Sequence, residues 1–88
     1  MSARIFRYEV PVDDQWHEVK LLGNPLAVGC REVAVVEFWA RAYDDGSVGY
    51  RRRFMVVGTG HPFPSHLRYW GTAVAPGGSL VWHLLEES

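Results

Sequence analysis

Residues 34–43 read AVVEFWARAY, and this stretch decides the fold. Its smaller apolar residues alternate with a second set that contains every charge, which is the period-two pattern of a β-strand with one buried face. The row expected to point inward consists of Ala34, Val36, Phe38, Ala40 and Ala42. The opposite row is expected to face solvent or a partner, and it consists of Val35, Glu37, Trp39, Arg41 and Tyr43.

The residues after this strand predict a hairpin. Residues 44–47 are Asp-Asp-Gly-Ser, and an Asp-Gly pair favours a tight turn because both central residues of the preferred turn need positive φ. Residues 48–57 are therefore predicted to form the partner strand. We expect its inner row to be Tyr50, Arg52, Phe54 and Val56, and its outer row to be Arg51, Arg53, Met55 and Val57.

Glycine and proline divide the rest of the chain into segments of strand length, without a long stretch of helical periodicity. In the first, residues 4–10, alternation predicts that Phe6, Tyr8 and Val10 point inward. Further strands are predicted at residues 16–22, 26–30, 67–75 and 80–86. A short helix capped by Asp13 is also compatible with residues 11–16. About seven short strands favour an all-β fold, a small antiparallel barrel or sandwich.

The composition fits one folded domain. At roughly 100 to 200 residues per domain, 88 residues leave room for a single small β domain, residues 1–88. Nine basic and ten acidic residues give a net charge of -1, so the chain lacks the positive field of general nucleic-acid binders. Without a signal peptide or an apolar run near the ~20 residues of a membrane helix, we expect a cytoplasmic protein that contacts no membrane. The single cysteine, Cys30, excludes an internal disulfide.

The most distinctive motif is Gly58-Thr59-Gly60-His61-Pro62-Phe63-Pro64, which follows a predicted strand and three consecutive arginines. Two glycines let backbone amides turn outward into an anion-binding concavity, although the same residues also suit a rigid loop without a ligand. The motif lacks the lysine and the serine or threonine that end a phosphate-binding P-loop.

The three arginines divide between two faces of their strand. Arg51 and Arg53 share the outer face, where their guanidinium groups suit phosphate because they form paired hydrogen bonds. Arg52 takes the inner face, where an unpaired charge is costly. We expect Arg52 to pair with a carboxylate, with a place at the rim, toward a ligand or toward a neighbouring subunit as the alternatives.

The four histidines do not have the spacing of a metal site, and we predict neither a metal nor a cofactor. His83 alternates with Val81 and Leu85, which favours a packed or interfacial side chain. His61 is the best placed for chemistry, but no nucleophile or orienting group is recognisable beside it. We therefore predict a protein that is not an enzyme, with a hydrolase centred on His61 as the alternative.

Exposed aromatic residues predict an interface. Trp39 lies in the outer row with Arg41 and Tyr43, and these three residue types dominate binding hot spots. A contact between copies of the chain is the simplest interpretation, so a homo-oligomer is expected.

The order of motifs resembles a family of small, uncharacterised proteins encoded by bacteriophages and found in some bacterial genomes. The resemblance rests on Ile5-x-x-Tyr8-Glu9 followed by Pro11, on residues 52–62 with their Gly-Thr-Gly-His-Pro, on residues 69–72, and on the Gly-Gly-x-Leu-Val-Trp-His of residues 77–83. It covers nearly the whole chain. Arginine outnumbers lysine eight to one here, whereas the basic positions of the usual member are often lysines.

The resemblance implies no known activity, and its phage context implies ordinary roles of small accessory proteins. The first is a sponge that sequesters an anionic nucleotide signal of host defence. The ligand site expected for it comprises Arg51, Arg53, Gly58, Thr59, Gly60, His61, Tyr69 and Trp70, with amides and arginines on phosphate and aromatic rings on a base. The alternatives are a protein-binding inhibitor or host-takeover factor acting through Trp39, Arg41 and Tyr43, and a minor virion or assembly protein.

Overall fold

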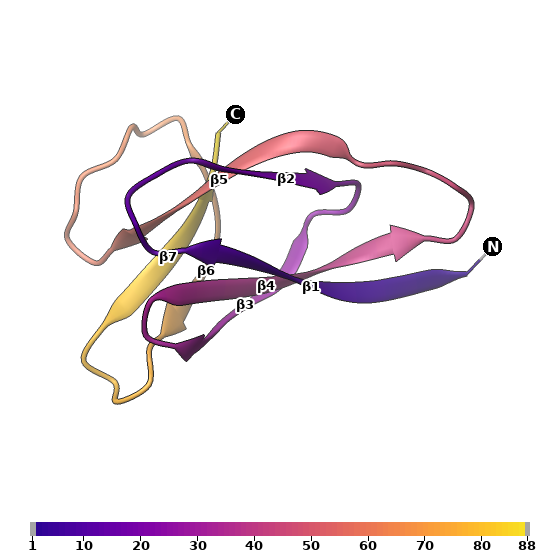
Figure 1. Ribbon diagram of the computed structural model, residues 1–88. Helices are drawn as coiled ribbons and strands as arrows, with labels where there is room; N and C mark the ends of the chain where they lie inside the picture. The colour runs from indigo at the N-terminus through magenta and orange to yellow at the C-terminus, as the bar shows by residue number, and fades with distance from the viewer. Residues whose placement is uncertain (1, 88) are drawn as a thin grey trace.

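The computed structural model describes residues 2–87 and contains seven antiparallel strands in two sheets (Figure 1). One sheet has three strands in the order β1-β4-β3, and the other has four in the order β2-β5-β7-β6. The strands are β1 (Ala3–Pro11), β2 (His17–Leu21), β3 (Pro25–Glu32), β4 (Val35–Tyr43), β5 (Tyr50–Gly58), β6 (Arg68–Val74) and β7 (Val81–Glu86). The predicted all-β fold is confirmed, as a sandwich rather than a closed barrel. Residues 2–87 contain no helix, so the helix considered for residues 11–16 is wrong.

The main core lies between the two sheets. Its fully buried residues come from inner rows of both sheets, and the rings of Phe38 and Phe54 meet across the interface with centroids 5.1 Å apart. The members are Val10, Leu21, Val36, Phe38, Ala40, Phe54, Val56 and Leu84. The inner rows predicted at Val36, Phe38 and Ala40 and at Phe54 and Val56 are therefore confirmed.

The predicted hairpin between β4 and β5 is wrong. Gly46 does adopt the positive φ of a tight turn, at 80°, but β4 stays paired with β1 and β5 pairs with β2 in the other sheet. The segment after the turn passes close to the end of β2, where a Cβ on Gly49 would lie 2.3 Å from the amide nitrogen of Leu21. The Asp-Gly signal specifies a local turn, whereas strand pairing is decided by distant residues.

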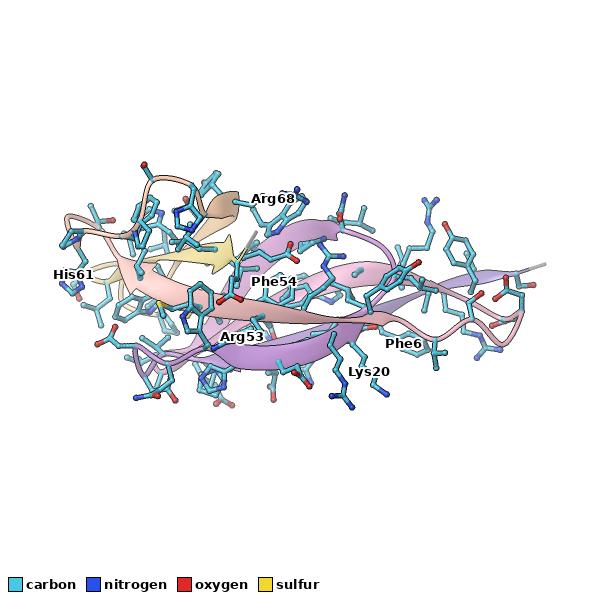
Figure 2. The ribbon with its side chains drawn as sticks, turned by 90° about the horizontal axis from the view of Figure 1, so that it is seen from above. Phe6, Lys20, Arg53, Phe54, His61 and Arg68 are labelled. Atoms are coloured by element: carbon cyan, nitrogen blue, oxygen red, sulfur yellow. The ribbon has the colours of Figure 1, made fainter. Side chains whose placement is uncertain are left out.

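Three residues predicted to point into the core are exposed instead: Ala34, which lies in the turn between β3 and β4, Phe6 and Tyr50. Phe6 lies on the edge strand β1, with 47% of its surface exposed, and Tyr50, the first residue of β5, is 73% exposed. Both occupy the margin of an elongated molecule that measures 42 × 28 × 16 Å, and Figure 2 shows Phe6 far from His61 along its length. For Phe6 and Tyr50, the alternation along the strand therefore predicts the correct face of the sheet. It overestimates how far the opposite sheet extends to cover that face.

Arg52 pairs with a carboxylate, as expected. Its Nε donates to Glu86 Oε2 at 2.6 Å and its Nη2 to Glu86 Oε1 at 2.8 Å. Its Nη1 also donates to the carbonyl oxygen of Gly23 at 3.0 Å, and its Nη2 to Asn24 Oδ1 at 3.0 Å. Trp70 Nε1 donates to Glu86 Oε1 at 2.8 Å. The arginine on β5 therefore joins β7 to the turn between β2 and β3.

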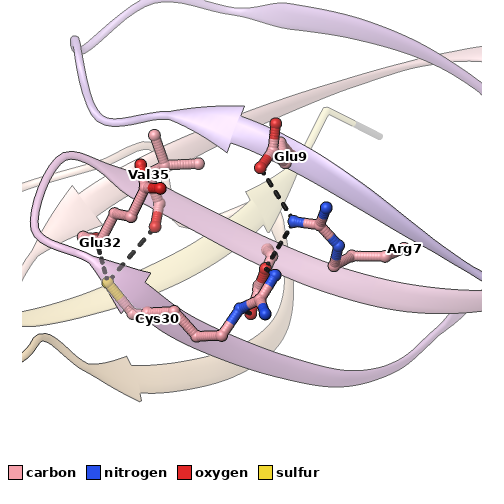
Figure 3. Close-up of polar contacts among 7 residues, drawn as sticks. Arg7, Glu9, Cys30, Glu32 and Val35 are labelled. Atoms are coloured by element: carbon pink, nitrogen blue, oxygen red, sulfur yellow. Dashed lines mark hydrogen bonds and ion pairs between the residues drawn. The ribbon is translucent and has the colours of Figure 1, made fainter.

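Glu37, predicted to face solvent or a partner, lies on the outer face of the three-stranded sheet but is buried, with 3% of its surface exposed. Arg7 donates to its Oε2 at 2.9 Å, and Arg31 approaches its Oε1 at 2.7 Å (Figure 3). Trp39 in the same row is half-buried against Gly29, whose Cβ position would lie 3.2 Å from the indole. The nearby thiol of Cys30 donates to the carbonyl oxygen of Glu32 at 3.0 Å, and burial raises its pKa.

Candidate functional site: a histidine cleft beneath a loop

The loop of residues 59–67 folds over the outer face of the four-stranded sheet. Val57 and Leu85, from the outer rows of β5 and β7, form a second small core with Leu67 at the end of the loop. Trp16 and Met55 pack against this core. The C-terminal end of the loop is thus packed against the outer face of the sheet through Leu67.

Two adjoining hollows lie around the start of this loop. One has a volume of about 270 Å³ and lies between the loop and the sheet, and the other, of about 400 Å³, lies on the side of Leu80. They share Gly58, Thr59 and His61. We call the first hollow the histidine cleft; its lining is Val57, Gly58, Thr59, Gly60, His61, Phe63, Tyr69, His83 and Leu85. Within the described chain, neither hollow is lined by a carboxylate.

A chain of side-chain hydrogen bonds borders the cleft. Tyr69 Oη lies 2.5 Å from Thr72 Oγ1, and Thr72 Oγ1 lies 2.8 Å from His83 Nδ1. The other ring nitrogen, His83 Nε2, lies 2.7 Å from Thr59 Oγ1. Both nitrogens of one histidine are therefore bonded to hydroxyl groups, and the chain joins β6 and β7 to the loop.

A β-bulge on β6 makes this chain possible. Regular alternation would place Tyr69 and Thr72 on opposite faces, because they are three residues apart. The pairing of β6 with β7 shifts between Tyr69 and Gly71, which inserts one extra residue at Trp70. After the shift Thr72 stands opposite His83, and its hydroxyl reaches Tyr69 on the same face.

A β-turn positions the loop residues. The amide of His61 donates to the carbonyl oxygen of Gly58 at 3.1 Å, and Gly60 has a φ of 89°, which glycine adopts without strain. The amide of Thr59 donates to the carbonyl oxygen of Val81. Two of the amides in this turn are thus already bonded, and Gly60 lies exposed at its tip.

The structure brings five of the eight predicted ligand residues together and separates three. Gly58, Thr59, Gly60, His61 and Tyr69 all line the histidine cleft. Trp70 instead faces the interior, where its indole bonds Glu86.

Arg51 and Arg53 lie far from the cleft on β5. Seven residues of extended strand separate Arg51 from Gly58 and five separate Arg53 from it, which corresponds to about 23 and 16 Å respectively. Figure 2 shows Arg53 in the middle of the molecule and His61 at one end. Each arginine faces a carboxylate: Arg53 lies 3.1 Å from Glu87, and Arg51 lies 3.8 Å from Glu18.

The residues predicted as an interface lie on the outer face of the three-stranded sheet. Arg41 and Tyr43 are exposed there and border a hollow of about 240 Å³ with Leu26. Ile5, the cross-strand partner of Arg41, is 62% exposed. Trp39 contributes less surface, because it packs on Gly29.

Sequence reasoning missed His83 and Phe63 as residues of the cleft, and it missed Thr72, which bonds His83 without lining the cleft. His83 was expected to be a packed or interfacial side chain, and Thr72 and Phe63 were not singled out. The alternation of His83 with Val81 and Leu85 places it on an outer face correctly, but the bulge that aligns Thr72 with it has no signal in the sequence beyond Gly71. The partners of His83 therefore depend on strand register.

Residues 2–87 contain no group of three or more histidine, cysteine or acidic side chains arranged to hold a metal ion. In the same range, no helix has the length and apolarity that crossing a membrane requires. Neither a curated protein nor a solved structure gives a significant match to the chain. A family model does match, over residues 1–88, and the chain therefore belongs to the family described as Domain of unknown function (DUF7352).

Proposed function

We propose that this protein binds a small anionic ligand of the nucleotide class in the histidine cleft. The observation that supports this most strongly is the convergence of Thr59, His61, Tyr69 and His83 on one open hollow. Small-molecule sites are concave, mostly apolar and supplied with a few convergent polar groups, in volumes of roughly 300–1,000 Å³. The cleft and its neighbour, at about 270 and 400 Å³, together fit this range.

The lining matches an anion attached to a flat ring. Imidazole side chains become cationic on protonation, and His61 and His83 both line the cleft. Among residues 2–87, no carboxylate lines the cleft to repel a negative charge. The backbone amide of Gly60, which is an exposed residue, and the hydroxyl of Thr59 add hydrogen-bond donors for phosphate oxygens. Phe63 and Tyr69 supply aromatic faces for a base.

The role that we propose is stoichiometric binding rather than catalysis. His83 bonds two threonine hydroxyls, and no carboxylate among the lining residues orients either histidine as a general base. A protein that binds a nucleotide without turning it over sequesters it. The phage context implied by the sequence resemblance makes a nucleotide signal of host defence the ligand class to test first.

The test is isothermal titration calorimetry with a panel of mono-, di- and cyclic nucleotides, followed by chromatography of the recovered ligand. We expect one nucleotide to bind and to be recovered intact. Tyr69→Ala and His61→Ala should weaken its binding at least tenfold, because each removes a group that lines the cleft.

Arg51→Ala is the matched control, because the Arg51 side chain is exposed far from the cleft. A tenfold loss in Arg51→Ala with none in Tyr69→Ala would move the site to the arginines. Binding by no member of the panel would contradict the proposal, and recovery of a hydrolysed nucleotide would support the hydrolase.

A second candidate function is supported by the outer face of the three-stranded sheet. There Ile5, Arg41 and Tyr43 expose apolar and cationic surface around the hollow at Leu26. This surface suits a second copy of the chain or a protein target. We expect Tyr43→Ala to lower the molecular mass in light scattering if copies associate through it. An unchanged assembly in Tyr43→Ala would remove this face from consideration as the contact between copies.

A further inference from the structure

We infer that the histidine cleft takes up one proton when it binds an anion, and that His83 is the residue that carries this proton. The inference rests on the proposed function, because it concerns the same cleft. It goes further by naming the protonation state in which the site recognises a phosphate group.

Hydrogen-bond counting in the neutral state supplies the argument. A neutral imidazole has one N–H donor and one acceptor nitrogen. If His83 Nε2 donates to Thr59, then Thr72 must donate to Nδ1, and Tyr69 can donate to Thr72. The hydroxyl hydrogen of Thr59 is then directed outward, while Tyr69 offers only lone pairs to the cleft.

Donation in the opposite direction along these hydrogen bonds is equally consistent with the distances between the atoms. If Thr59 donates to Nε2, then Nδ1 donates to Thr72, and Thr72 donates to Tyr69. Now the hydroxyl of Tyr69 is the one directed outward. In either neutral arrangement, the hydrogen-bond chain ends in one donor and one acceptor, which are the hydroxyl groups of Thr59 and Tyr69 in one order or the other.

Protonation of His83 changes both ends into donors. Both ring nitrogens then carry hydrogen, so Thr59 and Thr72 accept, Thr72 donates to Tyr69, and the hydroxyl hydrogens of Thr59 and Tyr69 are both available. Both of these residues line the cleft. An anionic ligand whose oxygens reach both ends can accept from both only in this state, which also places a positive charge beside it.

The surroundings of His83 do not supply another charge for this purpose. Its neighbour on β5 is Val57, its neighbours on β6 are Thr72 and Tyr69, and the loop contributes Thr59. The titratable groups at the cleft are therefore His61, Tyr69 and His83 itself. His61 is the competing proton acceptor, and the test must separate it from His83.

The experiment measures proton uptake with 3′,5′-cyclic AMP as probe, or with whichever phosphodiester of the panel binds, because a phosphodiester keeps one charge across the pH range used. Titrations at one pH are repeated in buffers with different ionisation enthalpies, which gives the number of protons bound. We expect uptake that approaches one proton at pH values where His83 is neutral in the free protein. There the affinity should fall tenfold for each further unit of pH.

Variants assign the proton. His83→Gln should reduce the uptake to zero and remove the pH dependence, whereas His61→Gln should weaken binding yet leave the uptake in place. Thr72→Val removes the hydroxyl group that bonds His83 Nδ1 and so interrupts the series of hydrogen bonds. It is the second test if His83→Gln does not fold, and it should also reduce the proton uptake. His66→Gln is the matched control, because this exposed loop histidine does not line the cleft.

The outcomes separate the two proposals. If no nucleotide binds, the proposed function fails and the inference fails with it. If a phosphodiester binds with zero proton uptake, or if the uptake is lost in His61→Gln and kept in His83→Gln, the inference is overturned while the proposed function stands.

Discussion

Two buried glutamates show how differently one kind of contact is used in the two sheets. Glu86 lies between the sheets, and its partner Arg52 has only 13% of its side chain exposed. Glu37 lies on the outer face of the three-stranded sheet, and its partners Arg7 and Arg31 have 42% and 68% of their side chains exposed. Both carboxylates are nearly inaccessible, but only one of them has a partner that is also removed from water.

The difference predicts where the free energy of unfolding depends on the pair. Removing Glu86 leaves the Arg52 guanidinium in a desolvated position, and an uncompensated buried charge is costly. Removing Glu37 leaves two arginines that can turn into solvent. The Arg52–Glu86 pair should therefore be essential to the fold, whereas the Glu37 cluster should be an addition to it.

The largest effect is expected for Glu86→Ala, which should lower the free energy of unfolding by about 3–5 kcal/mol. Arg52 would lose its two charged hydrogen bonds, and Trp70 Nε1 would lose its acceptor. Urea denaturation followed by tryptophan fluorescence measures the change.

Arg52→Met with Glu86→Leu is the matched double variant, because it removes both charges and fills the space. It should recover part of the loss. A Glu86→Ala protein as stable as the parent would show that water already reaches Arg52.

Glu37→Ala should have a smaller effect, a loss of about 1–2 kcal/mol, because hydrogen bonds to a charged group are lost but no charge is left buried. The same urea titration measures it, and Glu9→Ala, which removes an exposed carboxylate beside Arg7, is the control. A loss as large as that of Glu86→Ala would mean that Arg7 and Arg31 cannot reach solvent and that the contrast between the two sheets is false.

The smallest effect is expected in the loss of folding stability at acidic pH. Burial acts to raise the pKa of Glu37, but hydrogen bonds from Arg31 and Arg7 outweigh it, so the pKa lies below the ordinary value of 4.5. Burial is likewise outweighed at Glu86 by Arg52 and Trp70, which lowers its pKa. A lowered folded pKa contributes stability above pH 4.5 that is lost as the pH falls through the folded value.

Unfolding measured between pH 5 and pH 3 should therefore show a smaller decline for Glu37→Gln than for the parent. Asp13 and Asp45 also have lowered pKa values, from hydrogen bonds with His17 and Ser47 respectively, but they are present in both proteins and cancel. Equal declines in the two proteins would contradict the assignment of part of the acid sensitivity to Glu37.

The same contrast shows how far alternation along a strand predicts structure. It assigned Glu37 to the outer row and Arg52 to the inner row correctly, because side chains of a strand point to alternating faces whatever the partner strand is. It did not predict that Glu37 would be covered or that Phe6 would be exposed, since coverage depends on neighbouring strands. The hairpin signal at Gly46 failed in the same way, because the turn formed but β5 joined the other sheet.

By itself, the sequence determined the all-β class, the seven strand segments, most of the inner rows and the position of the Gly-Thr-Gly-His loop. These features follow from local periodicity, from glycine conformations and from the inability of proline to donate a backbone hydrogen bond. The tertiary structure alone decided the strand order and the separation of Arg51 and Arg53 from the loop. It also decided the hydrogen-bond chain that joins Tyr69, Thr72, His83 and Thr59. That chain depends on a bulge of one residue and on loop placement, and both are set by contacts between segments distant in sequence.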